Sequence, residues 1–171
     1  MCWCAVKKLL THSLGVTFTK TLSFEPRVLK VANKAATCLY ALKTLKTHGL
    51  QGQALRDVTL ATLLYASPAW SGFIKSEEKA KLQSVLNKTA RYGFLPEWSP
   101  KTIDELLESS DITLFKAALK NPDHVIHPLL PPPKAPGYNL RKRSHGLLLP
   151  ATQSNLLRKN FVYRMLFKDI Y

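Results

Sequence analysis

Residues 26–49 read PRVLKVANKAATCLYALKTLKTHG, and the expected fold is built around this segment. Its proline suits the first turn of a helix, while His48 and Gly49 mark a helix end. Between them, apolar side chains recur at alternating steps of three and four residues, which places them on one helix face. They are Val28, Val31, Ala35, Cys38, Leu42 and Leu45. The sequence therefore predicts one long helix that buries this stripe.

Two shorter helices are predicted downstream of the long one. The first covers residues 53–66 and ends at the Ser67–Pro68 dipeptide, because the residue before a proline avoids the helical backbone. The second begins at Ser76, a good N-cap, and is closed by Gly93. We expect both to bury the stripe of the long helix with their own apolar side chains. These are Leu55, Val58, Leu63 and Leu64 in the first, and Leu82, Val85, Leu86 and Ala90 in the second.

The C-terminal half carries weaker helix signals. One helix is predicted to start at Ser99–Pro100, and another after Ser109–Ser110 that ends at Asn121–Pro122. Prolines dominate residues 128–137, which indicates an extended segment. Residues 160–170 fit a short final helix. Its apolar side is formed by Phe161, Met165 and Leu166.

The N-terminal part contains the only strand signals. Residues 14–18 fit a short strand, residues 19–21 a turn, and residues 22–24 a return strand. The fold class expected from the whole sequence is mainly α, a helical bundle with a short N-terminal β-hairpin and an extended proline-rich C-terminal segment. The sequence divides into five expected parts. They are an unmatched N-terminal start at 1–13, to which no element is assigned, the hairpin at 14–25, a helical domain at 26–95, a second helical part at 96–127, and a proline-rich basic extension with a short terminal helix at 128–171.

The charge is strongly positive. The 171 residues include 25 Lys and Arg against 11 Asp and Glu, which gives a net charge of +14. Such a chain attracts polyanions, of which nucleic-acid backbones are the commonest. A charge that serves only solubility, or attraction to an anionic membrane surface, are the alternatives. The longest apolar stretch, residues 60–70, is too short to span a bilayer and contains Pro68, so we expect no membrane partner.

The cations are unevenly distributed, and their positions give the candidate binding residues. Glu25 is the only acid among the first 56 residues, and residues 124–168 contain none. In the long helix, Arg27, Lys30 and Lys34 lie on one flank of the apolar stripe, and Lys43 and Lys46 lie on the other flank further along. Arg141, Lys142 and Arg143 form a run in a proline-flanked segment without apolar periodicity. We expect this run to contact phosphates, with a nuclear-import signal as the alternative.

Catalytic and metal sites are not predicted. The acid pairs Glu77–Glu78 and Asp104–Glu105 fall in first helical turns, where neighbours diverge by roughly 100° and the helix dipole explains their charge. His124 and His127 combine poorly with Cys2–x–Cys4, so we expect no zinc. Aromatic residues interleave with cations and suit either base stacking or core packing. These are Tyr65, Trp70, Phe73, Tyr92, Phe94 and Trp98, with Lys75, Lys88 and Arg91.

Several of these segments, in this order and spacing, resemble one family. The N-terminal part of the chain resembles the segment after the polymerase core of non-LTR (LINE-type, jockey-like) retrotransposon reverse transcriptases. The resemblance lies in residues 14–18 and 22–24, in the basic helix with Tyr40–Leu42, and in the stretch Leu64–Trp70. The tail is similar as well. Its matching segments are 121–124, 127–131, 138–141 and 160–171.

The resemblance implies part of an RNA-directed DNA polymerase: the end of the palm at 14–25, a thumb-like domain at 26–95, and a C-terminal extension. The family's aspartate pair, which binds the catalytic magnesium ions, would lie before residue 14, and this sequence has no two adjacent aspartates. We therefore expect no catalytic residues and no cofactor in this chain, with magnesium only in a complete polymerase. The expected partner is RNA or DNA, held through its backbone.

Two other interpretations stay open. In the first, a host uses the chain as a module whose helices dock on a protein. In the second, the chain is a transposon relic without function. Three cysteines provide no disulfide framework, which favours a reducing, intracellular location, nucleus or cytoplasm. The sequence does not determine the oligomeric state.

Overall fold

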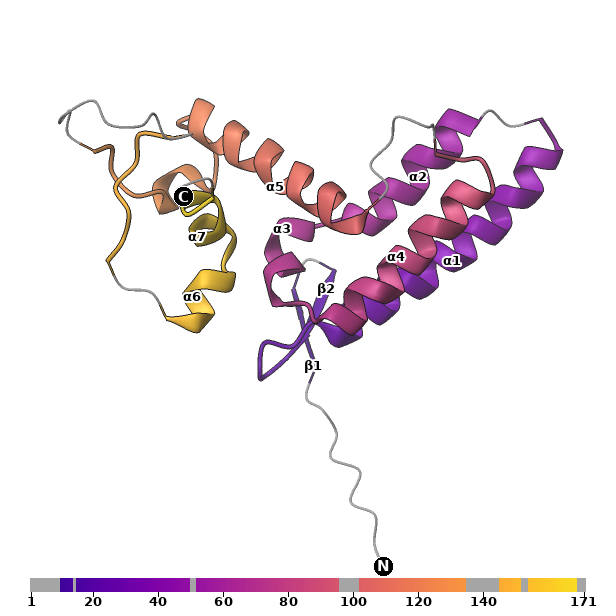
Figure 1. The fold of residues 1–171 in the computed structure, drawn as a ribbon, viewed down its shortest axis with the longest axis horizontal. Helices are drawn as coiled ribbons and strands as arrows, with labels where there is room; N and C mark the ends of the chain where they lie inside the picture. Colours follow the sequence, from indigo (N-terminus) through magenta and orange to yellow (C-terminus); the bar gives the residue numbers. More distant parts are fainter. Residues whose placement is uncertain are drawn as a thin grey trace, which may run out of the picture. The chain divides into compact units, whose positions relative to one another are not determined.

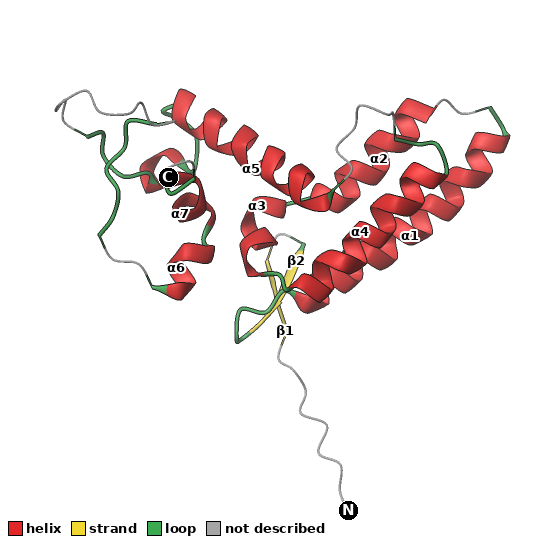
Figure 2. Ribbon diagram, in the orientation of Figure 1, coloured by secondary structure: helices red, strands yellow, loops and turns green. Residues whose placement is uncertain are grey.

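The computed structural model describes residues 10–13, 15–49, 52–95, 102–134, 145–151 and 154–168. Over these residues the chain is mainly helical, as predicted (Figures 1 and 2). It divides into two compact units, unit 1 over residues 1–107 and unit 2 over residues 108–171. Each unit has its own hydrophobic core. The finer domain limits given above stay predictions.

A two-stranded hairpin begins unit 1. Strands β1 (Leu10–Ser13) and β2 (Val16–Thr19) are antiparallel, and Gly15 in the turn between them has φ +79°. The predicted strand at 14–18 is therefore present as β2, but its predicted partner at 22–24 was wrong, because β2 pairs with the strand before it. Leu22 has a left-handed φ of +55°, and the Ser23 amide donates to the Thr19 hydroxyl, so the backbone turns there.

Helix α1 (Glu25–Thr47) forms the centre of unit 1 and confirms the long predicted helix. Four members of the predicted stripe are buried, whereas Cys38 is half-buried and Leu45 is 45% exposed. Leu39 is buried in their place, because α1 packs against helices on two sides and its buried face widens accordingly. The four confirmed core positions are Val28, Val31, Ala35 and Leu42.

The partners of α1 are α2 (Gly52–Leu64) and α4 (Ser76–Arg91), which lie beside it (Figure 1). In α2, Leu63 is buried as predicted, but Val58 is exposed and Thr59 is buried instead. The side chain of Leu55 lies outside the described residues. Ser67–Pro68 was predicted to end this helix. Helix α2 does end before this dipeptide, at Leu64, and Ser67–Pro68 then begins the short α3 (Ser67–Trp70), after Ala66 turns the chain with φ +53°.

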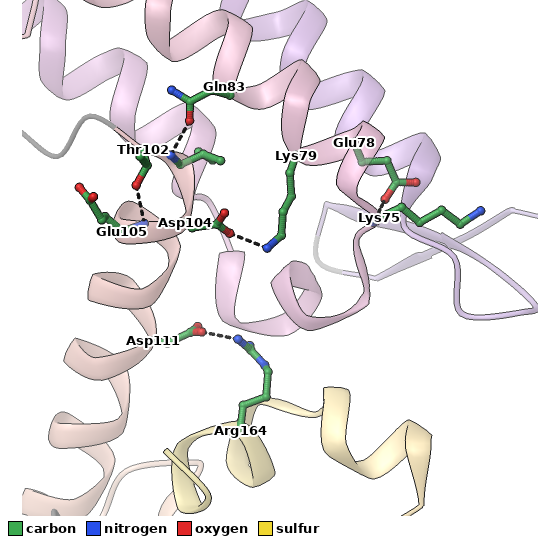
Figure 3. A network of polar contacts seen from close by, with 10 residues as sticks. Lys75, Glu78, Lys79, Gln83, Thr102, Asp104, Glu105, Asp111 and Arg164 are labelled. Atoms are coloured by element: carbon green, nitrogen blue, oxygen red, sulfur yellow. Dashed lines mark hydrogen bonds and ion pairs between the residues drawn. The ribbon is translucent and has the colours of Figure 1, made fainter. Parts of the chain in front are cut away.

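A short 3-10 helix, η1 (Ser71–Phe73), joins α3 to α4. Lys75 is the N-cap of α4, one residue before the predicted cap, and its amide donates to the Glu78 carboxylate at 2.7 Å (Figure 3). Gly93, with φ +70°, follows the helix end as predicted. Leu82, Val85 and Leu86 are buried, whereas Ala90 is exposed.

Helix α5 (Ile103–Lys120) is one helix where two were predicted. Buried positions recur through the two serines at helical steps, so the apolar face continues where a break was expected. They are Leu107, Asp111, Phe115 and Ala118. Its first amide, that of Ile103, donates to the side-chain oxygen of Gln83 at 2.7 Å (Figure 3). The predicted start at residues 99–100 lies outside the described residues.

Unit 2 continues with the 3-10 helix η2 (His127–Leu129), α6 (Asn155–Lys159) and α7 (Phe161–Leu166). The predicted final helix is present as α7, and its apolar residues are buried against Phe115. Helix α6 was not predicted. Asn160 ends α6 and also caps α7, because its side-chain oxygen accepts from the Val162 amide at 2.9 Å.

Part of the proline-rich segment is paired with a later stretch of the chain. Pro133 forms an isolated antiparallel bridge with Leu147, and the Lys134 amide donates to the Gly146 carbonyl at 2.7 Å. Throughout the described residues, each helix is too short or too polar to cross a bilayer.

Candidate nucleic-acid interface

A groove of about 530 Å³ lies between α1, α2 and the hairpin turn of unit 1. Among the described residues that line it, three are basic and none is acidic, so it offers a concentrated positive charge to a ligand. We call it the basic groove. Its lining is Gly15, Arg27, Lys30, Val31, Lys34, Val58, Ala61, Thr62 and Tyr65. The structure thus brings together three of the eight predicted binding residues.

Lys30 and Lys34 stand on α1 at the rim of this groove. They are four residues apart, which places them on the same side of the helix about 6 Å apart along its axis. Both side chains are exposed. Their aliphatic stems can cover the apolar wall of the groove while the ammonium groups reach the solvent, which is where a phosphate would be met.

Arg27 differs from the exposed cation predicted at that position. The residue is only 7% exposed, and its Nη1 and Nη2 atoms donate to the carbonyl oxygens of Gly15 and Tyr65, each at 3.2 Å. Its guanidinium also lies 5.3 Å from the centre of the Tyr65 ring. Burial lowers the pKa of the Arg27 guanidinium. Direct phosphate contact by Arg27 is therefore corrected to a structural role that fixes a charge in the groove wall.

Lys43 and Lys46 belong to a different surface. Lys34 and Lys43 are separated by roughly 14 Å along α1. Lys43 and Lys46 lie on the flank of the helix opposite to Lys30 and Lys34. The Nζ atom of Lys46 donates to the carbonyl oxygen of Tyr92 at 2.9 Å, beside the end of α4, and Lys43 lies 5.6 Å from the Tyr92 ring centre. Both lysines are exposed. Lys46 therefore supports a helix end, where a cation is favourable.

The predicted run of Arg141, Lys142 and Arg143 lies outside the described residues, as does Trp98. Among the other aromatics considered for stacking, Trp70 and Phe94 are buried in the core. Tyr65 and Tyr92 are exposed. Only Tyr65 borders the basic groove.

The acid pairs act at helix starts. Glu78 is buried and accepts the Lys75 amide, and Asp104 forms an ion pair with Lys79 at 2.5 Å (Figure 3). These contacts agree with the helix-terminal explanation of both pairs. Over the described part of the chain, no group of three or more His, Cys, Asp or Glu side chains is placed to hold a metal ion.

The histidines of the considered zinc site have other contacts. The Nδ1 atom of His127 lies 2.8 Å from the Ala118 carbonyl oxygen, and that of His124 accepts the Ile126 amide at 3.1 Å. Cys2 and Cys4 lie outside the described residues.

The two residues whose carbonyl oxygens accept the Arg27 hydrogen bonds were not assigned to the groove from the sequence. Gly15 and Tyr65 are far from Arg27 in the chain, and no local pattern relates the three. The one available signal was an aromatic residue among cations, which does not distinguish Tyr65 from the buried Trp70.

Comparison of the chain with protein-family models, with curated proteins and with solved structures gives no match.

Proposed function

We propose that this chain binds the backbone of nucleic acid without sequence preference, as the thumb-like and C-terminal part of a non-LTR retrotransposon reverse transcriptase that lacks the catalytic palm. The observation that carries the binding proposal is the basic groove, whose lining, as far as the structure describes it, has three cations and no acid. The net charge of +14 supports it. The retrotransposon origin rests on the resemblance of residues 14–171.

Binding would use the exposed cations of the groove rim. Lys30 and Lys34 displace counterions from phosphates, and Arg27 adds a fixed positive charge in a wall shielded from water. Backbone contacts contain no base information, so affinity would depend on charge and not on sequence. Lys43 and Lys46, which are exposed on a different surface of α1, would provide separate phosphate contacts.

A salt titration tests this proposal. Binding to duplex DNA and to an RNA–DNA hybrid should weaken linearly on a log–log plot against salt, with a slope of about −0.9 per phosphate neutralised. Replacing Lys30 and Lys34 together by Gln should reduce the slope by about 1.8. The change is measured by fluorescence anisotropy of a labelled duplex.

A matched control removes the same charge elsewhere. Lys116 and Lys120 are also exposed and four residues apart, on α5. Their double replacement by Gln should leave the slope unchanged. An equal loss in both double variants would mean that the charge acts as a uniform coat, and no binding at low salt would leave it as a solubility device.

A protein-docking role is favoured by one observation. Leu29, Ala36 and Tyr40 lie on the same exposed side of α1, and Tyr40 is 77% exposed. Apolar side chains at helical spacing on a solvent face are suited to a partner helix. Association with a partner protein that persists at high salt and is lost in Tyr40→Ala would support this function in place of nucleic-acid binding.

A further inference from the structure

Tyr65 lines two grooves of unit 1. One is the basic groove, and the other is an apolar groove of about 560 Å³ lined also by Val16, Phe18, Leu22, Phe24 and Ala69. This volume is within the range of small-molecule sites. A positively charged surface and an apolar one therefore meet at a single aromatic residue.

The Tyr65 ring is held in place without being covered. The Arg27 guanidinium lies 5.3 Å from the ring centre and also donates to the Tyr65 carbonyl oxygen. The backbone of Gly15 lies close to the ring edge, since a Cβ atom at Gly15 would be 3.7 Å from Tyr65 Cε1. The residue is nevertheless 54% exposed. A ring positioned in this way loses little conformational freedom when a planar ligand stacks on it.

The two grooves together match the two chemical parts of a nucleotide. Cations suit the phosphate, and an exposed aromatic next to an apolar hollow suits a base. In a duplex the base faces are hidden by stacking, so a duplex would use the basic groove alone. An apolar peptide segment would use the apolar groove alone and leave the cations of the neighbouring groove without a function. An unpaired nucleotide uses both.

We propose that the grooves on either side of Tyr65 form a binding site for an unpaired nucleotide of single-stranded nucleic acid. The base stacks on Tyr65 and enters the apolar groove, and the adjoining phosphates contact Lys30 and Lys34. This inference rests on the proposed function, because it assumes that the basic groove binds the nucleic-acid backbone. It adds a preference for single strands.

The test compares single strands of about ten nucleotides with blunt duplexes of the same sequence by fluorescence anisotropy, using the full chain and separate RNA and DNA series. The wild-type chain should bind the single strand more tightly. Tyr65→Ala should weaken single-strand binding about tenfold and duplex binding less than about twofold. The substitution keeps the carbonyl oxygen that Arg27 binds, so the fold is retained. Tyr65→Phe should bind like the wild type.

Two further variants sharpen the result. Ala69→Phe fills the apolar groove without removing a polar group, and should weaken single-strand binding as Tyr65→Ala does. Tyr40→Ala makes the same chemical change at an exposed tyrosine outside both grooves, and should have no effect. Circular dichroism checks that every variant is folded.

The outcomes separate this inference from the function it rests on. If the Lys30 and Lys34 replacement weakens both nucleic-acid forms but Tyr65→Ala and Ala69→Phe change neither, the nucleotide site is refuted and backbone binding stands. Equal losses for both forms in Tyr65→Ala would also refute it. If neither form binds at low salt, the proposed function itself fails.

Discussion

Arg27 connects three segments of unit 1 at one point. It stands on α1, and it donates to the carbonyl oxygens of Gly15 in the hairpin turn and Tyr65 after α2. A charged donor in a hydrogen bond contributes about 1.5–3 kcal/mol, and truncation would leave both carbonyls without it. We expect Arg27→Met to lower the free energy of unfolding by about 2–4 kcal/mol, measured by urea denaturation.

The neighbouring exposed cation is the control for Arg27. Lys30→Met should change the free energy of unfolding by less than about 0.5 kcal/mol, because surface substitutions have small effects. Arg27→Lys should restore the stability only in part, since an ammonium group cannot donate to two carbonyls in the geometry of a planar guanidinium. Similar costs for Arg27→Met and Lys30→Met would contradict the structural role.

The Asp111–Arg164 ion pair provides a pH-dependent prediction in unit 2. Asp111 is buried, and burial raises its pKa above the ordinary 3.8, although the charge of Arg164 acts in the opposite direction. A carboxyl group with a raised folded-state pKa binds its proton more tightly when folded. Its contribution to stability is therefore complete below the ordinary pKa and is lost as the pH rises through the raised value.

Removing Arg164 should make this dependence steeper. Arg164→Met leaves a buried carboxylate without its cation, and should cost about 3–5 kcal/mol of unfolding free energy at neutral pH. Part of this loss should be recovered on acidification, because protonation removes the buried charge of Asp111. Urea denaturation at neutral and at acidic pH measures the difference. The double variant Asp111→Asn with Arg164→Met has no such carboxyl group, so recovery in acid by that variant would exclude the explanation.

Among the elements, α1 allows a test of how the helix is rotated against its neighbours. Leu42 is buried, whereas Leu45, one turn later, is 45% exposed. Leu42→Ala should cost about 2–5 kcal/mol through lost contacts and a residual cavity, and Leu45→Ala less than about 1 kcal/mol. Urea denaturation of both variants tests this order. Equal costs would mean that the helix is rotated relative to the packing described.

Helix limits were predictable where local residues set them. Pro26 and Gly49 bracket α1, and Gly93 follows α4, because a proline and glycines act on the backbone at their own positions. The partner of β2 was not predictable in this way. Strand pairing depends on which segment meets the edge in three dimensions, and Leu10–Ser13 carries no stronger strand signal than Leu22–Phe24.

The candidate site, too, was predictable where local residues set it and not where distant residues do. Helical periodicity was enough to place Lys30 and Lys34 on one flank of α1. The same periodicity placed Arg27 beside them, but its burial depends on carbonyl oxygens contributed by residues 15 and 65, which no local pattern relates to it. The two serines of α5 misled for the opposite reason, because a continuous buried face outweighs their weak helix propensity.

For the whole molecule, the proposed function predicts an absence of polymerase activity. The sequence has no adjacent pair of aspartates to bind catalytic metal ions. The purified chain should not extend a DNA primer on an RNA template in the presence of magnesium, whether or not it binds that template. The assay needs an active reverse transcriptase as its positive control, and robust extension by this chain alone would rule out the fragment interpretation.

Asn160 serves two helices at once. Its amide donates to the Leu157 carbonyl at the end of α6, and its side-chain oxygen accepts the Val162 amide at the start of α7. A proline there would remove the first bond, and an alanine the second. In diverging genomic copies, purifying selection for a folded protein would confine this codon to Asn, Asp, Ser or Thr. In a relic, the codon would drift at the neutral rate, so natural variation at one position can distinguish a maintained gene from a decaying one.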